Sequence, residues 1–349
     1  MPRRTTVMIL AIAVSLAIFL TPGRGRATTF TQVTSDTTSE TDPSPSPDGK
    51  WIAFTSDRCG RGATQIYIMP ADGGEARQLT QEADSVRAGT PTWAPDGKSL
   101  IFVSTRSKRH NLYSIPFEGG EVKPMSRMPG SNRFGVYSRD GKYIAFYSNR
   151  LEPGELFGFN IYVMSAGGET EEDFARQVTN VKGSPGHPTW SADGKWIAFV
   201  AKEYDEKKQN TMEGNILFSK YHLYKVPSGG GTPVQLSSGA VEDTWPAWSP
   251  DGKSIAFGRQ TGTKRDVWLL DVATSKAFPL TTTGKCIKPN WSYDGKSIYY
   301  TSVNEQYYDL WVARDLTLKP PATAKKSTRT KPRPKTASTR TAAPPATGK

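Results

Sequence analysis

A short motif built on Asp-Gly-Lys occurs six times along the chain, and each copy runs directly into an apolar stretch such as IAF. Successive motif aspartates are 48, 44, 53, 58 and 43 residues apart. A repeat of this length is typical of β-propellers, in which each blade is a sheet of four strands. The motif aspartates are Asp48, Asp96, Asp140, Asp193, Asp251 and Asp294.

The residues that follow each motif indicate a whole blade rather than an isolated turn. A second strand such as IYVM comes next, and in four copies a glycine-rich hairpin follows it. Several copies then close with a short strand of alternating polar and apolar residues, such as RQLT at Arg77–Thr80. We therefore predict an all-β fold, a propeller of six four-stranded blades.

The two ends of the repeat array predict how the ring closes. The sixth repeat runs out after its third strand at Leu310–Ala313, with no closing strand of the RQLT type. Near the other end, Phe30–Thr34 resembles the closing strands but precedes the first motif. We expect this segment to be the outer strand of blade six, because closure removes the two exposed sheet edges of an open array.

The chain divides into three parts. Residues 1–27 have the pattern of a signal peptide, with Arg3 and Arg4 before an apolar run at Val7–Leu20. That run is shorter than the roughly 20 residues of a membrane-spanning helix, which favours a cleaved signal over a retained anchor without deciding between them. Residues 28–318 form the propeller. Residues 319–349, rich in Pro, Ala, Thr and Lys, are predicted to be a disordered basic tail.

The net charge of +12 belongs to the two ends of the chain. The leader carries +4 and the tail +9, and subtracting both from +12 leaves −1 on the propeller. The propeller is therefore not a basic platform for nucleic acid, and we expect no specific nucleic-acid partner. The tail is either merely solvated or a tether to an anionic polymer of the cell envelope.

Two cysteines, Cys59 and Cys286, are the only thiols. The blade pattern places both in loops on the same face of neighbouring blades. In an oxidising compartment they could pair, provided that their Cα atoms lie close enough, and the sequence leaves pairing and free thiols both open.

The repeated residues are interpreted as structural. Asp and Gly suit a tight turn, since Asp bonds nearby amides and Gly adopts positive φ. Five of the six residues three positions before the motif aspartates are aromatic, which indicates packing between blades rather than a platform for sugars. These residues are Pro45, Trp93, Tyr137, Trp190, Trp248 and Trp291.

Function is expected where the repeats differ. Six positions before each motif aspartate, in the loop leading into the innermost strand, the residue type varies among acid, cation, imidazole and aromatic. We expect these residues to ring the channel mouth as a binding surface, with tolerated loop variation as the alternative. They are Asp42, Thr90, Phe134, His187, Trp245 and Lys288. Arg58, Arg106 and Arg150, in loops that open on the same face, either bond carbonyls at the blade edge or bind a ligand.

The repeats resemble those of the TolB family of periplasmic propellers. The resemblance rests on WSPDGK at Trp248–Lys253, IYVM at Ile161–Met164 and RQLT at Arg77–Thr80, and it covers the whole propeller. It implies a periplasmic binding protein that receives a partner such as a peptidoglycan-associated lipoprotein at its channel mouth. We expect an exported monomer that needs no cofactor. TolB has an additional N-terminal α/β domain, and we expect no contacts of that domain here.

Two kinds of enzyme with propeller domains are alternatives to a binding protein. A propeller-capped serine peptidase needs a Gly-x-Ser-x-Gly turn, which the sequence lacks. A carbohydrate-active propeller, a lyase or hydrolase with its site at the same mouth, is the remaining alternative. Its metal would need histidine ligands, but His110, His187 and His222 fall in different loop classes without ligand spacing, so we expect no metal site and no catalytic residues.

Overall fold

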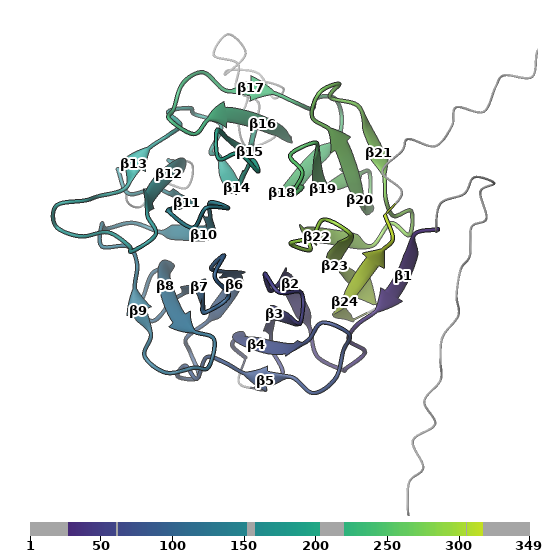
Figure 1. Ribbon diagram of the computed structural model, residues 1–349, viewed down its shortest axis with the longest axis horizontal. Coiled ribbons are helices and arrows are strands. Elements are labelled where there is room, and N and C mark those ends of the chain that lie inside the picture. The colour runs from purple at the N-terminus through teal and green to yellow at the C-terminus, as the bar shows by residue number, and fades with distance from the viewer. Residues whose placement is uncertain (1–26, 61, 152–157, 203–219, 305, 317–349) are drawn as a thin grey trace, which may run out of the picture. The chain divides into compact units, whose positions relative to one another are not determined.

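The computed structural model describes residues 27–60, 62–151, 158–202, 220–304 and 306–316. In these residues the chain forms six antiparallel sheets of four strands each, arranged around a central channel (Figure 1). The prediction of an all-β propeller with six blades is confirmed. No helix among the described residues is long and apolar enough to span a bilayer. The predicted leader and tail lie outside the described ranges.

The strands follow one another from the innermost to the outermost position of each blade. Blade one consists of β2 (Glu40–Pro45), β3 (Trp51–Ser56), β4 (Gln65–Pro70) and β5 (Arg77–Gln78). Blade two consists of β6 (Ala88–Trp93), β7 (Ser99–Ser104), β8 (Asn111–Pro116) and β9 (Lys123–Pro124). Blade three consists of β10 (Asn132–Tyr137), β11 (Tyr143–Ser148), β12 (Asn160–Ser165) and β13 (Arg176–Gln177).

The second half of the ring repeats this order. Blade four consists of β14 (Gly186–Trp190), β15 (Trp196–Lys202), β16 (Tyr221–Pro227) and β17 (Val234–Gln235). Blade five consists of β18 (Glu242–Trp248), β19 (Ser254–Thr261), β20 (Lys264–Asp271) and β21 (Ala277–Pro279). Blade six consists of β22 (Cys286–Trp291), β23 (Ser297–Asn304), β24 (Tyr307–Arg314) and the N-terminal strand β1 (Thr29–Gln32).

The ring closes through its N-terminal strand, as the sequence predicts. Strand β1 pairs antiparallel with β24, from Thr29 opposite Arg314 to Gln32 opposite Trp311. Beyond the strand, the backbone N–H of Val33 donates to the Leu310 carbonyl at 2.7 Å. Because blade six is completed from the opposite end of the chain, the eight-residue strand β24 is covered and the outer edge of the blade is the short strand β1.

The Asp-Gly motif forms the turn between the first and second strands of each blade. In blade one, Ser46 Oγ donates to Asp48 Oδ1 at 2.6 Å, and the same carboxylate oxygen accepts from the backbone N–H of Lys50 at 3.1 Å. Gly49 follows with a φ of 72°. Five blades share the serine and blade two has Ala94 in its place, so the turn depends mainly on Asp and Gly.

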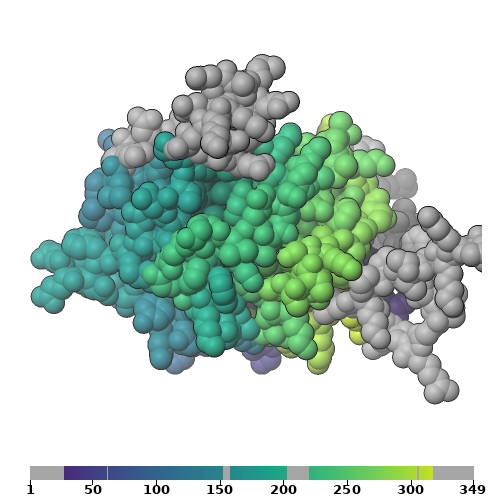
Figure 2. Space-filling view, turned by 90° about the horizontal axis from the view of Figure 1, so that it is seen from above, coloured from purple at the N-terminus to yellow at the C-terminus, as the bar shows by residue number. Residues whose placement is uncertain are grey.

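The hydrophobic core lies between adjacent blades, as in the clusters shared by blades one and two and by blades three and four. On the side seen in Figure 2, the teal, green and yellow blades pack directly against one another. Three tryptophans of the repeated set also link neighbouring blades, because each indole N–H donates to a carbonyl of the preceding blade at 2.9 to 3.1 Å. The donors and acceptors are Trp93 to Ser44, Trp190 to Val136 and Trp291 to Ala247. Trp248 departs from this pattern and bonds the Gly252 carbonyl in its own blade. These indoles are buried packing groups.

Candidate functional site

The six residues expected at the channel mouth lie inside the innermost strands, so their placement in loops was wrong. Each sits where the register of that strand shifts against its neighbour, which marks a β-bulge. Each also has a positive φ, between 49° and 56°, which is uncommon for residues other than glycine. We call Asp42, Thr90, Phe134, His187, Trp245 and Lys288 the bulge ring.

The sequence carries a signal for these bulges in the residue that follows each of them. In five blades the bulge-ring residue is followed by proline, and in blade three Phe134 is followed by Gly135. Proline has no N–H to donate and is confined within sheets to edges and bulges. The prolines are Pro43, Pro91, Pro188, Pro246 and Pro289.

Five members of the bulge ring contact one another in sequence from blade to blade. Lys288 Nζ lies 2.8 Å from Asp42 Oδ1 and 5.8 Å from the centre of the Trp245 ring. The His187 ring meets Trp245 edge-on at 5.9 Å and Phe134 edge-on at 5.1 Å between centroids. These contacts join side chains of five blades into one chain of neighbours along the channel rather than leaving a set of free recognition groups.

The charged side chains of the bulge ring, Asp42 and Lys288, neutralise each other. Burial would raise the pKa of Asp42, but Lys288 and hydrogen bonds outweigh burial and hold that pKa below its ordinary value. Burial, helped by the nearby Lys288 cation, lowers the pKa of His187 to about 4. At neutral pH, Asp42 and Lys288 therefore form an ion pair and His187 is uncharged.

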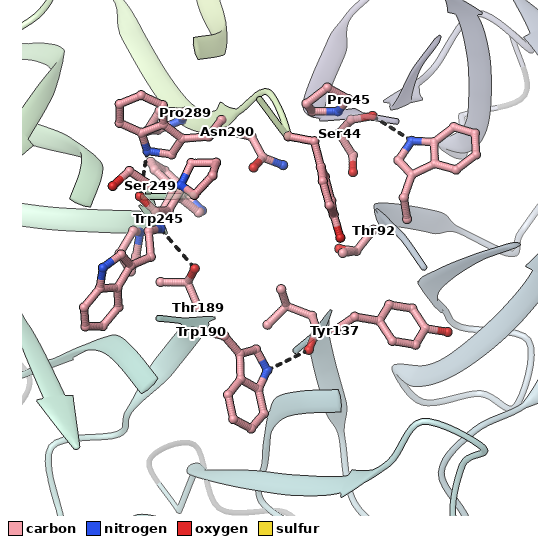
Figure 3. A pocket seen from close by; sticks show the side chains of 18 of the residues that line it. Ser44, Pro45, Thr92, Tyr137, Thr189, Trp190, Trp245, Ser249, Pro289 and Asn290 are labelled. Carbon is pink, nitrogen blue, oxygen red and sulfur yellow. Dashed lines mark hydrogen bonds between the residues drawn. The ribbon is translucent and has the colours of Figure 1, made fainter. Parts of the chain in front are cut away.

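Two cavities meet at the bulge ring from opposite faces of the propeller. The turn face carries the Asp-Gly turns, and its pocket has a volume of about 180 Å³ (Figure 3). The loop face carries the segments that lead into the innermost strands, and its cavity has a volume of about 370 Å³. Trp245 lines both cavities. The bulge ring thus separates two chemically different openings.

The turn-face opening is crossed by a contact between opposite blades. Arg139 of blade three donates from Nη2 to the Tyr293 carbonyl of blade six at 3.2 Å, and its guanidinium lies 4.7 Å from the Tyr293 ring centre. Blades three and six face each other across the channel (Figure 1). Both residues immediately precede motif aspartates, a position that the sequence analysis did not single out.

The loop-face cavity combines aromatic walls with polar groups from blades three, four and five. Its aromatic lining comprises Tyr147, Phe159, His187, Tyr221 and Trp245, and its charged lining comprises Arg133, Glu242, Arg259 and Arg265. Two buried nitrogens, His187 Nδ1 and Arg133 Nε, have no hydrogen-bond partner among the described residues. Aromatic surface with a few polar groups is typical of binding pockets, and this cavity is the better candidate site.

Comparisons with known proteins agree with this architecture. Residues 10–126 match the Tricorn protease N-terminal beta propeller domain. The chain is 32% identical over 134 residues to the Tol-Pal system protein TolB of Anaeromyxobacter dehalogenans, and it superposes on the putative TolB of Agrobacterium tumefaciens with a TM-score of 0.58. The chain is a β-propeller protein that is similar to TolB.

These matches cover only part of the chain and, for the curated relatives, only a small part of the relative. The TolB match spans 38% of this chain and 28% of the relative, and the solved putative TolB is 20% identical over 79% of this chain and 90% of its own. The uncharacterized peptidase YuxL of Bacillus subtilis is 33% identical over 46% of this chain but only 22% of its own length. The chain therefore spans about a quarter of these curated relatives.

An enzyme also shares the fold. The oligogalacturonate lyase of Vibrio parahaemolyticus superposes with a TM-score of 0.53 and 12% identity, covering 82% of this chain and 94% of the lyase. At this level of identity the likeness concerns the propeller architecture alone.

The arginines considered as secondary binding residues are held by carboxylates in the TolB-like propeller. Arg58 Nη2 lies 3.0 Å from the buried Glu40 Oε1, and Nε donates to Ser56 Oγ at 3.2 Å. Arg106 and Arg150 bond the carboxylates of Glu82 and Glu169 in the same manner. Their partners are carboxylates rather than the expected blade-edge carbonyls, so these guanidinium groups are already engaged.

Among the described residues, the cysteines form no disulfide and the histidines belong to no metal-binding cluster. Cys59 and Cys286 are both free, and Cys286 is buried beside Thr283 and Ser302. His110 Nδ1 lies 3.1 Å from Arg133 Nη2, whereas His222 is buried in β16. Within the described ranges, no group of three or more His, Cys, Asp or Glu side chains could hold a metal ion.

Proposed function

We propose that this TolB-like propeller is an exported, non-catalytic binding protein of the cell envelope that receives a protein partner on its loop face. The observation that carries this proposal is the loop-face cavity, with aromatic walls, arginines and two buried nitrogens without partners. Aromatic and arginine side chains are the residues that most often anchor protein–protein interfaces. The partner class that the family resemblance implies is a peptidoglycan-associated lipoprotein.

The turn face is less suited to the same role. Its tryptophan N–H groups are used to hold neighbouring blades together, and Arg139 and Tyr293 cross its opening. A partner entering there would have to break the contact between Arg139 and Tyr293, and the energy lost would offset the energy of binding. The loop face has no such bridge among the described residues.

The periplasm is the proposed location, because the signal peptide predicted from the sequence and the likeness to TolB together fit an envelope protein. Expression of the full chain in a Gram-negative host, followed by osmotic release, should recover the propeller in the periplasmic fraction. Recovery from the cytoplasm alone would contradict export.

Affinity capture from envelope extracts tests the proposed function. We expect the wild-type chain to retain a protein partner and Arg265→Glu to lose most of it, because Arg265 is exposed and lines the loop-face cavity. Arg176→Glu is the matched control, since Arg176 is equally an exposed arginine but lies on the outermost strand β13. Equal capture by both variants would contradict a loop-face site, and release of unsaturated sugars from a uronic-acid polymer would favour the lyase alternative.

The basic tail is proposed to act separately from the propeller, as a tether to an anionic envelope polymer. Removal of residues 319–349 should abolish salt-sensitive binding to lipopolysaccharide while leaving capture of the protein partner unchanged. Unchanged binding to lipopolysaccharide would remove this part of the proposal.

A further inference from the structure

Arg133 is a charged group of the loop-face cavity without an acidic partner. It lies in β10 beside the bulge-ring residue Phe134, with its guanidinium 5.6 Å from the Phe159 ring centre. Its Nη2 lies 3.1 Å from His110 Nδ1, and its buried Nε has no hydrogen-bond partner. Among the described residues it forms no ion pair, although the desolvation of a guanidinium is costly without one.

Four other arginines near this face show what Arg133 lacks. Each of these guanidinium groups lies 4.8 to 5.3 Å from the centre of an aromatic ring and also bonds a carboxylate of the propeller. The four pairs are Arg58 with Glu40, Arg106 with Glu82, Arg150 with Glu169 and Arg259 with Asp243. Arg133 has the aromatic neighbour but not the carboxylate.

The surroundings of Arg133 favour an anion. Burial lowers the pKa of His110, and the cations Arg133 and Arg87 lower it further, so His110 is neutral and does not add a competing charge. The fork of N–H groups on a guanidinium matches the two oxygens of a carboxylate. Tyr147, Phe159 and Tyr221 line the same cavity and offer apolar surface beside that carboxylate.

The size of the cavity fits part of a partner rather than a folded domain. A volume of about 370 Å³ lies toward the lower end of the range for small-ligand pockets, which is roughly 300 to 1,000 Å³. One or two side chains of an inserted peptide segment would fill it.

We propose that Arg133 binds a carboxylate carried by a peptide segment of the partner, with an apolar side chain of the same segment packed against Phe159 and Tyr221. This inference rests on the proposed loop-face binding function and names the chemistry of its ligand. The peptide would give Arg133 a carboxylate partner, whereas the four paired arginines bond carboxylates of the propeller itself.

Two synthetic peptide pools test this inference on the full chain. Both pools are capped pentapeptides with apolar or aromatic residues flanking one central position, which is glutamate in the first pool and glutamine in the second. By fluorescence polarisation, the wild type should bind the glutamate pool at least tenfold more tightly. Arg133→Gln should remove that difference, and Arg133→Lys should keep only part of it because lysine lacks the planar fork. Arg176→Gln, on the outer strand, should retain the difference in full.

Three results would overturn the inference. The first is equal binding of both pools by the wild type. The second is a preference for the glutamate pool that remains in Arg133→Gln when that variant has the wild-type melting temperature. The third is binding of trigalacturonic acid without binding of either pool. The outcome also separates the two proposals. A partner captured through Arg265 but indifferent to Arg133 contradicts only the carboxylate assignment, whereas the absence of any loop-face capture contradicts the proposed function itself.

Discussion

Substitution of Asp309 by asparagine should stabilise the protein at alkaline pH. Asp309 lies in β24 at the seam between blades six and one, is 2% exposed, and accepts one hydrogen bond from Gln32 Nε2 at 3.1 Å. Its Oδ1 atom and Glu40 Oε2 are both buried without a partner among the described residues. Burial, with added repulsion from Glu40 and Asp36, raises the pKa of Asp309 to about 6 from an ordinary value of 3.8.

The sign and size of the effect follow from linkage between protonation and folding. Because the folded-state pKa is raised, the stabilising contribution of the protonated form is complete below pH 3.8 and is lost as pH rises through about 6. Each pKa unit corresponds to about 1.4 kcal/mol, so the ionised Asp309 lowers the free energy of unfolding by up to about 3 kcal/mol at pH 8. Asparagine keeps the shape and cannot ionise. We expect Asp309→Asn to be about 1 to 3 kcal/mol more stable at pH 8, with the difference falling below about 1 kcal/mol at pH 4.

The contribution of Asp309 ionisation is measured by the difference in the free energy of unfolding between the wild type and Asp309→Asn. The lowered pKa of His187 acts in the opposite direction, since its contribution is complete above pH 6.5 and is lost as pH falls toward about 4. Urea unfolding of both proteins at several pH values measures the difference directly. Asp271→Asn serves as the control, because hydrogen bonds from Thr274 lower the pKa of Asp271. Removal of that carboxylate should therefore lower the free energy of unfolding at pH 8. If Asp309→Asn were less stable than the wild type at pH 8, or the difference did not shrink toward pH 4, the reasoning would be refuted.

Two further predictions concern the packing and charge of the ring. Trp190→Ala should lower the free energy of unfolding by about 3 to 5 kcal/mol, because it removes a buried indole and its hydrogen bond to the Val136 carbonyl. Chemical denaturation measures this loss. If the loss were smaller than that of Trp51→Ala, which removes a half-buried indole, the packing role of Trp190 would be contradicted. Lys288→Met should cost about 3 to 5 kcal/mol by leaving the Asp42 carboxylate without its ion pair. Adding Asp42→Asn to that variant should recover most of the loss in a thermal unfolding series, and the absence of recovery would show that the pair does not act as described.

The blade architecture could be predicted because its determinants are local and repeated. The carboxylate of Asp48 reaches a backbone amide only two residues away, and Gly49 supplies the positive φ in the same turn. Ring closure was also predictable, since the sequence at Phe30–Thr34 has the pattern of a closing strand and one blade lacks such a strand.

The candidate site was only partly predictable, because it depends on contacts between blades. The variable positions were recognised from their place in the repeat, but their location at bulges was missed although five are followed by proline. The ion pair of Lys288 with Asp42 joins residues 246 positions apart. Nothing in the sequence near Arg133 indicates that its guanidinium lacks a carboxylate, whereas that of Arg150 bonds Glu169. Such differences emerge only when neighbouring sheets pack together.

Hydrogen exchange of the free protein and of its complex with the captured partner tests loop-face binding most directly. The account predicts slower exchange on binding at Ser184, Gly186, Gln260 and Arg265, which line the loop-face cavity, and unchanged exchange at the turns that hold Asp140 and Asp294. Protection at those turns, with no change at the loop-face residues, would contradict it.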